Sequence, residues 1–491
     1  MSLPAIDWIT LLPFLSVSGL ALAILGAGLF LDDDEVLGWG ALVGLGVTAV
    51  ATAVLIGQRG SAFNGTFVLD GYALFFDLLL LAVGMLVVLM SMSYVEETGI
   101  GAGEYYALVL FALAGMIVMA SATDLIVIFL GLEVMSISVY ILAGAWRTQV
   151  RSNEASMKYF LLGAFATGFL LYGIALVYGA TGATRIDLVA DKISAVPDHR
   201  LLLAGVAMLL VAFGFKVAAV PFHMWAPDVY DGAPTPIAGF MATGVKTAAF
   251  AALVRVLLEA FPTASALWQP IIAGLALATI ILGNTVALAQ QSIKRMLAYS
   301  SIAHAGYVLV AVWAGTTLGA GAVSFYLLAY SVTTLASFGI LASIEHVGSR
   351  TVLVDDLEGL YSVRPGAALA LSICLLSLLG FPGTLGFIGK WYLIAAAVAE
   401  RQYILPVVMV LGSLVSAGYY LPVIMAMTMK PTRSLEAHRQ VRFSWAARAA
   451  VAVAVAMIIV FGVWPTGPLA TALKSAETLG QGPPAVLTGK R

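Results

Sequence analysis

Long apolar runs separated by short polar segments fill almost the whole chain. A helix needs about 20 mostly apolar residues to cross the hydrocarbon core of a bilayer. Measured against that length, the runs predict about fourteen membrane-spanning helices. Their expected limits are 8–31, 36–57, 71–93, 105–121, 123–146, 156–180, 201–225, 235–260, 266–289, 297–316, 320–346, 367–398, 402–428 and 445–465.

Two of these helices are expected to be broken. Proline removes a backbone donor and clashes with the carbonyl one turn back, so the helix over 201–225 cannot pass Pro221 undisturbed. The helix over 367–398 contains GFPGTLGFIGK, which places Pro382 shortly before Lys390. Paired broken helices in matching halves are typical of transporters built from inverted repeats.

This pattern predicts an all-α polytopic membrane protein with two inverted five-helix repeats, each with a broken helix as its fourth member. Three helices would precede the first repeat, and one helix with a short tail would follow the second. The expected segments are 1–104, 105–260, 266–428 and 429–491.

Composition agrees with a membrane protein. The 491 residues are 61% hydrophobic and 10% charged, with a mean hydropathy of +1.01, whereas a soluble domain carries about 25% charged residues. The single cysteine, Cys374, excludes a disulfide framework and the Cys-rich motifs of iron–sulfur or haem sites. The net charge of −2 says nothing about partners, but nucleic-acid binding would need a basic face, and the sequence has none.

No soluble domain interrupts the predicted helices. The longest polar connections, about 181–200 and 347–366, are too short for a folded catalytic module. Any redox or hydrolytic chemistry would therefore lie on other subunits. Lysine and arginine are slightly more frequent in one set of loops, with twelve against nine, and Arg255 is counted among the nine. This excess places both termini outside the cytoplasm.

Ionisable side chains occur at depths where charge is costly and where it marks a functional site by default. About fifteen apolar residues precede Lys216, which is over 20 Å of helix and too far for its ammonium to reach the surface easily. Lys246 lies about ten residues into its span, and Lys390 lies in the second broken helix. Glu133 is in the middle of its span, and His304 is in AYSSIAHAGYVLV.

Each of these residues also has a structural interpretation. Glu133 could be a protonated packing residue, and His304 is as readily a hydrogen-bonded packing residue as a proton relay. If Glu133 pairs with Lys216, opening and closing the pair could load and release a proton. Moving one charge against 100 mV costs about 2.3 kcal/mol, and an ion pair is worth a similar amount.

Other polar residues receive structural roles. We expect Asp124 to be a helix-start acid and His223 to cap the broken helix or the loop after it. Lys294 and Arg295 are expected in a loop, as anchors on the cytoplasmic side. Asp77 is intramembrane but close to a helix end, and we assign no role to it.

Four segments together resemble a known family. They are ATDLIVIFLGLEVMSISVYIL, FKVAAVPFHMWAPDVYDGAPTPIAGFMATGVKTAAF, IKRMLAYSSIAHAGY and GFPGTLGFIGKWYL. They resemble the antiporter-like membrane subunits of respiratory complex I and the related Mrp cation/proton antiporters, over nearly the whole chain. By motif, the family's proton path falls on Glu133, Lys216, Lys246, His304 and Lys390. The resemblance makes the first repeat an entry half-channel and the second an exit half-channel.

Within that family, the lysine at position 390, the length and the short tail look most like the subunit N branch. The MrpD-type component of the Mrp Na+/H+ antiporters is the close alternative. The resemblance implies no cofactor or metal site in this chain, with NAD, FMN, iron–sulfur clusters and quinone in partner subunits. It implies as partners an antiporter-like subunit M, small membrane subunits and lipids. The expected location is a bacterial plasma (inner) membrane, crossed many times.

Three other functional classes remain open from the residues alone. An Mrp-type antiporter would exchange sodium for protons without redox chemistry. A solute permease would need a pocket of polar and aromatic groups, whereas here charges recur on successive helices. A structural scaffold would not need four costly charges at membrane depth. Proton stoichiometry, the electron donor and the quinone type do not follow from the sequence.

Overall fold

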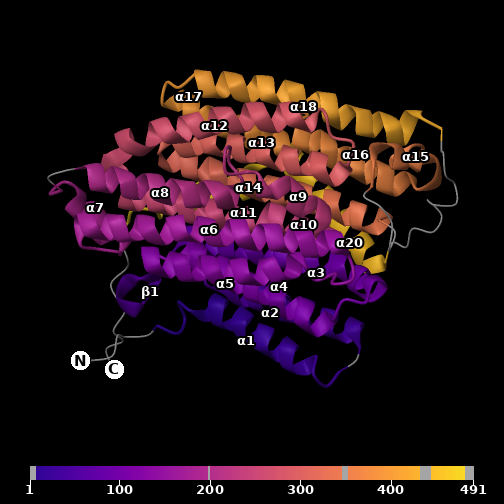
Figure 1. The fold of residues 1–491 in the computed structure, drawn as a ribbon, viewed down its shortest axis with the longest axis horizontal. Coiled ribbons are helices and arrows are strands. Elements are labelled where there is room, and N and C mark those ends of the chain that lie inside the picture. The colour runs from indigo at the N-terminus through magenta and orange to yellow at the C-terminus, as the bar shows by residue number, and fades with distance from the viewer. Residues whose placement is uncertain (1–6, 32, 197–198, 346–351, 432–443, 482–491) are drawn as a thin grey trace.

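The computed structural model describes residues 7–31, 33–196, 199–345, 352–431 and 444–481. Most of this part of the chain is helical, and the long helices run side by side (Figure 1). Twelve helices are long and apolar enough to cross a membrane, and α1 and the α16–α17 pair are shorter apolar elements. Together they make up the expected crossings, so the prediction of an all-α polytopic fold is confirmed.

The first half of the chain contains one small hairpin that the pattern did not predict. Strands β1 and β2 pair antiparallel, with Ser61 opposite Val68. The elements are α1 (Leu12–Ala27), α2 (Asp34–Val54), β1 (Gly60–Ala62), η1 (Phe63–Gly65), β2 (Phe67–Leu69), α3 (Gly71–Thr98), α4 (Ala102–Ser121), α5 (Leu125–Ala143), α6 (Val150–Thr181), α7 (Ile186–Ile193), α8 (His199–Val217), α9 (Trp225–Gly232), α10 (Thr235–Phe240), π-helical η2 (Met241–Val245), α11 (Lys246–Arg255) and π-helical η3 (Val256–Ala260).

The second half is helical throughout its described residues. Helix α14 packs against α3, α10, α16, α17, α20 and α21, so it lies at the centre of the bundle. The elements are η4 (Pro262–Ala264), α12 (Ser265–Ala287), α13 (Ile293–Ala314), α14 (Thr317–Ile344), η5 (Val354–Leu357), α15 (Leu360–Val363), α16 (Pro365–Leu379), α17 (Leu385–Ala399), α18 (Ile404–Met429), α20 (Trp445–Val463) and α21 (Thr466–Ala476). The division into two inverted repeats stays a prediction.

Both expected helix breaks are present. Helix α8 ends at Val217 and α9 begins at Trp225, so the chain is not helical at Pro221. Helix α16 ends at Leu379 and is capped by Gly380, whose φ of 89° suits a residue without a side chain. Helix α17 begins at Leu385, beyond Pro382. Each break places a lysine next to freed backbone groups.

The bundle has two ends, which we call the termini face and the loop face. The termini face holds the β1–β2 hairpin, α7 and the described C-terminal residues, because the amide of Tyr72 donates to Thr478 Oγ1 at 3.0 Å. The C-terminal ends of α1, α5, α12 and α14 lie at the loop face. In Figure 1, α7 and β1 lie at one end of the helices, and α15 lies at the other.

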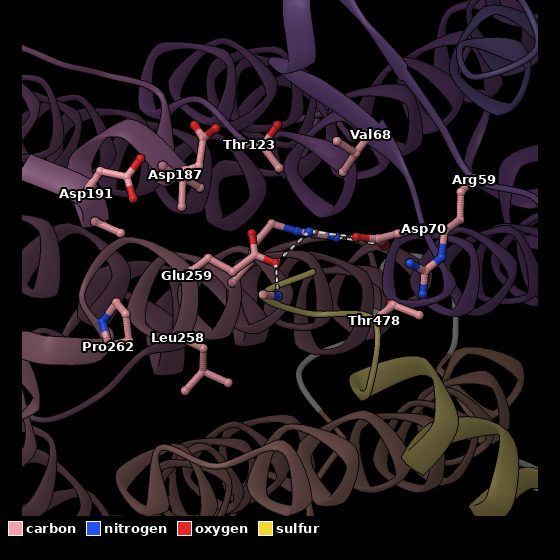
Figure 2. A pocket seen from close by; sticks show the side chains of 14 residues that line it. Arg59, Val68, Asp70, Thr123, Asp187, Asp191, Leu258, Glu259, Pro262 and Thr478 are labelled. Carbon is pink, nitrogen blue, oxygen red and sulfur yellow. Dashed lines mark hydrogen bonds and ion pairs between the residues drawn. The ribbon is translucent and has the colours of Figure 1, made fainter. Parts of the chain in front are cut away.

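A buried ionic cluster closes the bundle at the termini face. Arg255, which the sequence analysis counted with the loop cations, is instead 1% exposed inside the fold. It donates two hydrogen bonds to Asp70, at 2.9 and 3.0 Å, and one to Glu259 at 3.3 Å. These residues line a cavity of about 390 Å³, around which Figure 2 shows Asp70, Glu259 and Asp187. The carboxylates of Asp70 and Glu259 compensate a charge that would otherwise be very costly to bury.

Small residues let neighbouring helices approach closely. A Cβ built on Gly173 of α6 would lie 3.0 Å from the carbonyl oxygen of Gly205 of α8. A Cβ on Gly283 of α12 would lie 2.6 Å from the backbone nitrogen of Ala303 of α13. Apolar side chains gain little from leaving lipid, so such close packing holds membrane helices together.

Candidate functional site

Four buried basic side chains form the candidate site. Lys216, Lys246, His304 and Lys390 are 1%, 2%, 3% and 6% exposed. Lys216 ends α8 just before the first break, and Lys390 lies in the second turn of α17 after the second break. Lys246 begins α11 directly after the π-helical segment η2, and His304 is in the middle of α13. Wide helical turns of this kind occur mostly at functional sites.

Hydroxyl groups and aromatic rings surround Lys216. Its ammonium donates to Ser136 Oγ at 2.7 Å and to Tyr140 OH at 3.1 Å, both on α5. The same ammonium lies 5.2 Å from the centre of the Tyr140 ring and 5.9 Å from that of Tyr159. Hydrogen bonds and ring faces therefore accommodate the charge.

Glu133 has a different partner from Lys216. Its Oε1 accepts a hydrogen bond from Thr167 Oγ1 on α6 at 2.7 Å, and its side chain is half-buried at the lateral surface. Within the described chain, no basic group pairs with Glu133, so the hypothesised pair with Lys216 is not formed in this conformation. Ser136, which accepts from Lys216, lies about one helical turn from Glu133 on α5.

Lys246 begins a row of polar groups. Its ammonium donates to the carbonyl of Ser301 at 2.8 Å and to its hydroxyl at 2.5 Å. Tyr330 of α14 donates to the same hydroxyl at 2.7 Å. The Tyr330 ring lies 5.3 Å from the ring of His304, measured between centroids.

Two tyrosines hydrogen-bond the His304 ring. Its Nδ1 lies 2.5 Å from Tyr326 OH, and its Nε2 lies 3.3 Å from Tyr420 OH. Tyr420 also hydrogen-bonds Ser300, one turn back on α13. Both ring nitrogens therefore have a partner that can exchange a proton.

Lys390 ends the row. Its ammonium donates to Ser413 Oγ and to the carbonyl of Leu379, each at 2.9 Å, and lies 4.8 Å from the centre of the Tyr307 ring. The Leu379 carbonyl is one of the groups freed by the break after α16. Tyr307 is also linked to Asn284, whose Nδ2 donates to its hydroxyl at 3.0 Å.

Helix α13 supplies one edge of the row. Ser301, His304 and Tyr307 follow at intervals of three residues and so lie on one face of the helix. The Tyr307 ring is 5.3 Å from His304, on the side towards Lys390. The row thus runs from Lys246 through His304 to Lys390, all on elements of the bundle centre. We call this set the Lys246–Lys390 row.

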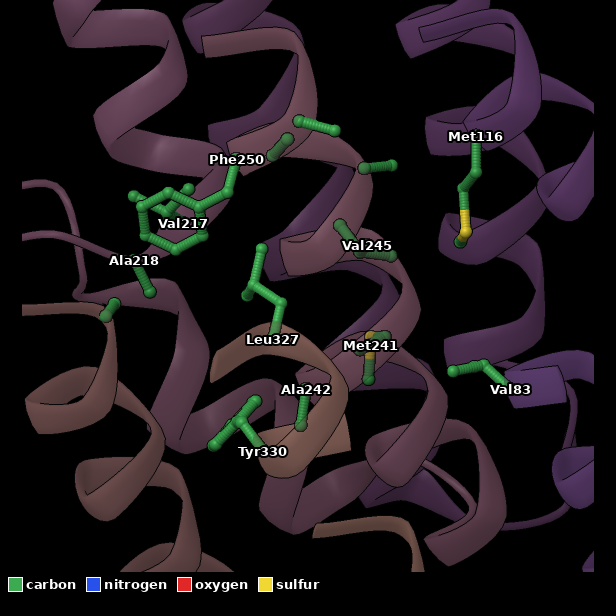
Figure 3. Close-up of a cluster of buried hydrophobic side chains, with 14 of the residues drawn as sticks. Val83, Met116, Val217, Ala218, Met241, Ala242, Val245, Phe250, Leu327 and Tyr330 are labelled. Atoms are coloured by element: carbon green, nitrogen blue, oxygen red, sulfur yellow. The ribbon is translucent and has the colours of Figure 1, made fainter. Parts of the chain in front are cut away.

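An apolar cluster separates Lys216 from this row. Val217 and Ala218, which follow Lys216, and Val245, which precedes Lys246, belong to the cluster in Figure 3. Figure 3 shows Leu327 of α14 and Phe250 of α11 among them. Among the described residues, no hydrogen bond joins Lys216 to Lys246. The site therefore consists of two polar clusters with apolar side chains between them.

The remaining polar residues fall outside the row. Asp124 caps α5 by accepting from the amide of Ile126 at 2.8 Å, so its helix-start role is confirmed. Nδ1 of His223 is buried with no partner among the described residues, so no cap forms through that atom. Both carboxyl oxygens of Asp77 are likewise without a partner in the described chain.

Lys294 and Arg295 were predicted wrongly as loop residues. Both lie in the first turn of α13, because Ser292 caps that helix and starts it earlier than expected. Lys294 donates to the carbonyl of Ala233 at 2.9 Å and lies 3.6 Å from Glu345. Arg295 and Lys158 both bind Asp228 of α9, at 2.7 and 2.8 Å.

These ion pairs hold α9 at the loop face. Burial acts to raise the pKa of Asp228, but hydrogen bonds from Lys158 and Arg295 outweigh it, so this pKa lies below its ordinary value. The carboxylate therefore stays charged at neutral pH. The second half of the first broken helix is thus attached to α6 and α13 by charge, rather than only by apolar packing.

Sequence reasoning missed the tyrosines and small polar residues of the row. They are Asn284, Ser301, Tyr307, Tyr326, Tyr330 and Tyr420. The three-residue spacing of Ser301, His304 and Tyr307 could have predicted that they share one face of α13. No local sequence pattern predicts that tyrosines of α14 and α18 contact this face. Within the described residues, no group of three or more His, Cys, Asp or Glu side chains is placed to hold a metal ion.

Comparison with known proteins places this arrangement in context. The family described as "NADH:quinone oxidoreductase/Mrp antiporter, TM" matches residues 122–416. The chain is 46% identical to NADH-quinone oxidoreductase subunit N of Trichlorobacter lovleyi, over 85% of this chain and 86% of that one. It is 43% identical to subunit N of Chloroflexus aggregans, over 94% and 97% of the two chains.

Solved structures share the whole fold. A chain of respiratory complex I from Thermus thermophilus with bound Aureothin is 37% identical, with a TM-score of 0.81 over 93% of this chain and 98% of that one. A chain of the Mrp complex from a Dietzia species is 22% identical, with a TM-score of 0.83 over 96% and 97%. The second similarity concerns the fold alone.

Proposed function

This chain belongs to the family of membrane subunits shared by NADH:quinone oxidoreductases and Mrp antiporters, and from that premise we propose that it is subunit N of a bacterial proton-pumping NADH:quinone oxidoreductase. The observation that supports this best is the Lys246–Lys390 row, which crosses the bundle centre with exchangeable groups. The similarity to curated subunit N proteins over most of their length favours this branch of the family.

In this proposal, Lys216 and Glu133 form the entry side of the path. Lys216 takes up a proton that arrives from the loop face, which the lysine and arginine distribution assigns to the cytoplasm. The proton then crosses the apolar contact between Lys216 and Lys246. Crossing requires Val217, Ala218 and their neighbours to admit water, because apolar side chains cannot relay a proton.

Transfer through the second half follows the row. Lys246 passes its proton to Ser301 and Tyr330, and His304 takes it between Tyr326 and Tyr420. Lys390 receives it beside Tyr307 and releases it on the far side of the membrane. A hydroxyl both accepts and donates, so a step between hydrogen-bonded members needs only a rotation of the donor. The steps from Tyr330 to His304 and from His304 to Tyr307 join rings whose centres are 5.3 Å apart, so they need a local side-chain movement or a water molecule.

The driving force would come from outside this chain. Electron transfer from NADH to quinone, with FMN and iron–sulfur clusters, is assigned to partner subunits, so this chain contributes to a translocase without holding a redox centre. Its partners would be an antiporter-like subunit M, small membrane subunits and lipids of the bacterial inner membrane. One charge moved against 100 mV requires about 2.3 kcal/mol, which is the scale of one rearranged ion pair or hydrogen-bond network.

An Mrp-type sodium/proton antiporter component is the alternative, because the description of the matching family covers both groups of proteins. Purification of the native complex distinguishes the two. Subunit N predicts co-purifying flavin and iron–sulfur subunits, and acidification of liposomes driven by NADH in sodium-free buffer. Co-purification with small antiporter subunits only, with sodium-dependent proton movement and no response to NADH, would overturn the proposal.

A further inference from the structure

A buried ion pair lies at the loop face, outside the Lys246–Lys390 row. Lys294, in the first turn of α13, is 3% exposed, and its ammonium lies 3.6 Å from the carboxylate of Glu345, which follows α14. Thr235 of α10 donates a hydrogen bond to the same carboxylate. The Glu345 side chain is 12% exposed, so the carboxylate has a narrow opening towards the water at the loop face. We call these two residues the Lys294–Glu345 pair.

The pair is aligned with the row along α13. Lys294 and Ser301 are seven residues apart, which is two helical turns or about 10 Å, so they lie on one face of the helix. Ala298 lies between them on this face and is small and buried. Ser301 in turn accepts two hydrogen bonds from Lys246. The face of α13 that binds Lys246 therefore continues to the loop face at Lys294.

Tyr230 of α9 connects the surroundings of the pair with Ser301. It lies three residues before Ala233, whose carbonyl accepts from Lys294 at 2.9 Å. The Tyr230 hydroxyl points the other way along the bundle and interacts with the side chains of Ser301 and Tyr330. The Tyr230 side chain, which is 0% exposed, thus leads from the loop face to the branch point of the row.

Thr334 of α14 is a second hydroxyl at this junction. It lies one turn from Tyr330, nearer the loop face, is 2% exposed, and interacts with the Tyr330 hydroxyl. Neither Thr334 nor Tyr230 has a partner within hydrogen-bond geometry among the described residues. A buried hydroxyl without a partner is costly, and ordered water commonly supplies the missing bond. Two such hydroxyls beside Ser301 indicate a place where water can bind.

We propose that protons also enter the row directly from the loop face, along a second inlet formed by the Lys294–Glu345 pair, Tyr230 and Thr334. A proton taken up at the carboxylate passes through water to the Tyr230 hydroxyl, and then through Ser301 to the lysine that begins the row, once that lysine has passed on its own proton. Each hydroxyl accepts one proton and releases another, so its charge is unchanged after the transfer. This inlet avoids Lys216 and the apolar side chains beyond it. It rests on the proposed function, because it supplies the same row.

The test measures the rate of NADH-driven acidification inside liposomes that contain the intact complex. Tyr230→Phe removes the hydroxyl but keeps the ring and changes no charge, and Glu345→Gln removes the group that takes up the proton. Each should slow acidification about twofold or more, because the inlet through Lys216 stays open. Since Glu345→Gln leaves Lys294 less compensated, the yield of assembled complex is measured alongside. Tyr106→Phe is the matched control: its hydroxyl is also buried without a described partner, but packs against Gly38 of α2.

A double variant distinguishes a second inlet from a step on the first. With two parallel inlets, Lys216→Met combined with Tyr230→Phe should slow acidification about tenfold or more, well beyond either single variant. Equal rates in the double variant and in Lys216→Met alone would overturn the proposal, as would a wild-type rate in Tyr230→Phe or an equal loss in Tyr106→Phe. Lys246→Met separates this inference from the proposed function. If Lys246→Met stops pumping while Tyr230→Phe does not slow it, only the inlet is wrong; wild-type pumping by Lys246→Met would contradict the row itself.

Discussion

Lys246 donates hydrogen bonds to both the carbonyl and the hydroxyl oxygen of Ser301. The same hydroxyl accepts from Tyr330, so Ser301 is the branch point between the lysine and the aromatic part of the row. A buried lysine needs acceptors for its protons, and here one residue supplies two of them. Ser301 is therefore as important to the proposed path as the charged residues themselves.

Replacing Ser301 by alanine should impair pumping and leave the fold intact. Ser301→Ala keeps the carbonyl contact of Lys246 but removes its link to Tyr330. Loss of a hydrogen bond to a charged group costs about 1.5–3 kcal/mol, so coupled NADH oxidation should slow about 10- to 100-fold. Ser301→Thr retains the hydroxyl and is the matched control. Equal rates in the alanine, threonine and wild-type complexes would show that this branch point does not carry protons.

The contact between Lys390 and Tyr307 predicts a stepwise loss of proton pumping in two variants of Tyr307. Tyr307→Phe keeps the ring beneath the ammonium and loses the hydroxyl with its bonds to Asn284 and Ser413. Tyr307→Leu loses the ring as well, and a desolvated cation–π contact is worth about 2 kcal/mol. Proton pumping should therefore fall severalfold in the phenylalanine variant and by a further factor of about 10 or more in the leucine variant. A phenylalanine variant that pumps no better than the leucine variant would assign the effect to the hydroxyl.

The Asp70–Arg255 pair should dominate stability at the termini face. Asp70→Asn leaves the guanidinium in place with much of its charge uncompensated, and breaking a buried pair in this way costs about 3–5 kcal/mol. Glu259→Gln should cost less, because Glu259 makes only one longer contact with Arg255, at 3.3 Å. Thermal unfolding of the purified complex measures both. The prediction is wrong if the glutamine variant is the less stable of the two.

Asp228 gives the attachment of α9 a pH dependence. Its pKa is lowered by Lys158 and Arg295, so the stabilisation is fully present above the unfolded-state pKa of about 3.9. It is lost as the pH falls through the lower folded-state value. Hydrogen exchange of the α9 amides, corrected for the intrinsic effect of pH, should therefore be steady from pH 7 to about 4 and faster below.

The variant Asp228→Asn should lack this acid response. The three side chains are partly exposed, so the effect at neutral pH should be modest, about 0.5–1 kcal/mol or a two- to fivefold faster exchange in α9. Asp187→Asn is the matched control, because Asp187 bonds Arg185 at the other face of the bundle. Its effect should be confined to α7. Identical exchange of α9 in both variants would contradict the attachment.

The sequence predicts the helices and breaks because both depend on local rules. Apolar length determines the spans, and Pro221 and Pro382 interrupt the two helices at the expected places. It also predicts the depth of Lys216, Lys246, His304 and Lys390, since depth follows from position along a helix. Lys294 shows the limit of this reasoning: a start of α13 a few residues earlier moves an expected surface anchor into the interior.

The contacts between helices required the structure. Tyr326, Tyr330 and Tyr420 reach His304 and Ser301 from α14 and α18, and nothing in their own segments distinguishes them from packing tyrosines. Arg255 was taken for a surface cation because its partner Asp70 is 185 residues away. The separation of Glu133 from Lys216 likewise depends on which faces of α5 and α8 meet.

Proton translocation by the Lys246→Met variant tests the central claim most directly. The intact complex in liposomes is given NADH, and internal acidification is measured per NADH oxidised. Methionine matches the length of the lysine stem but carries no proton, so the ratio should fall about tenfold or more, while Lys192→Met on α7 should match the wild type. A Lys246→Met complex that translocates as many protons per NADH as the wild type would contradict a path through the Lys246–Lys390 row.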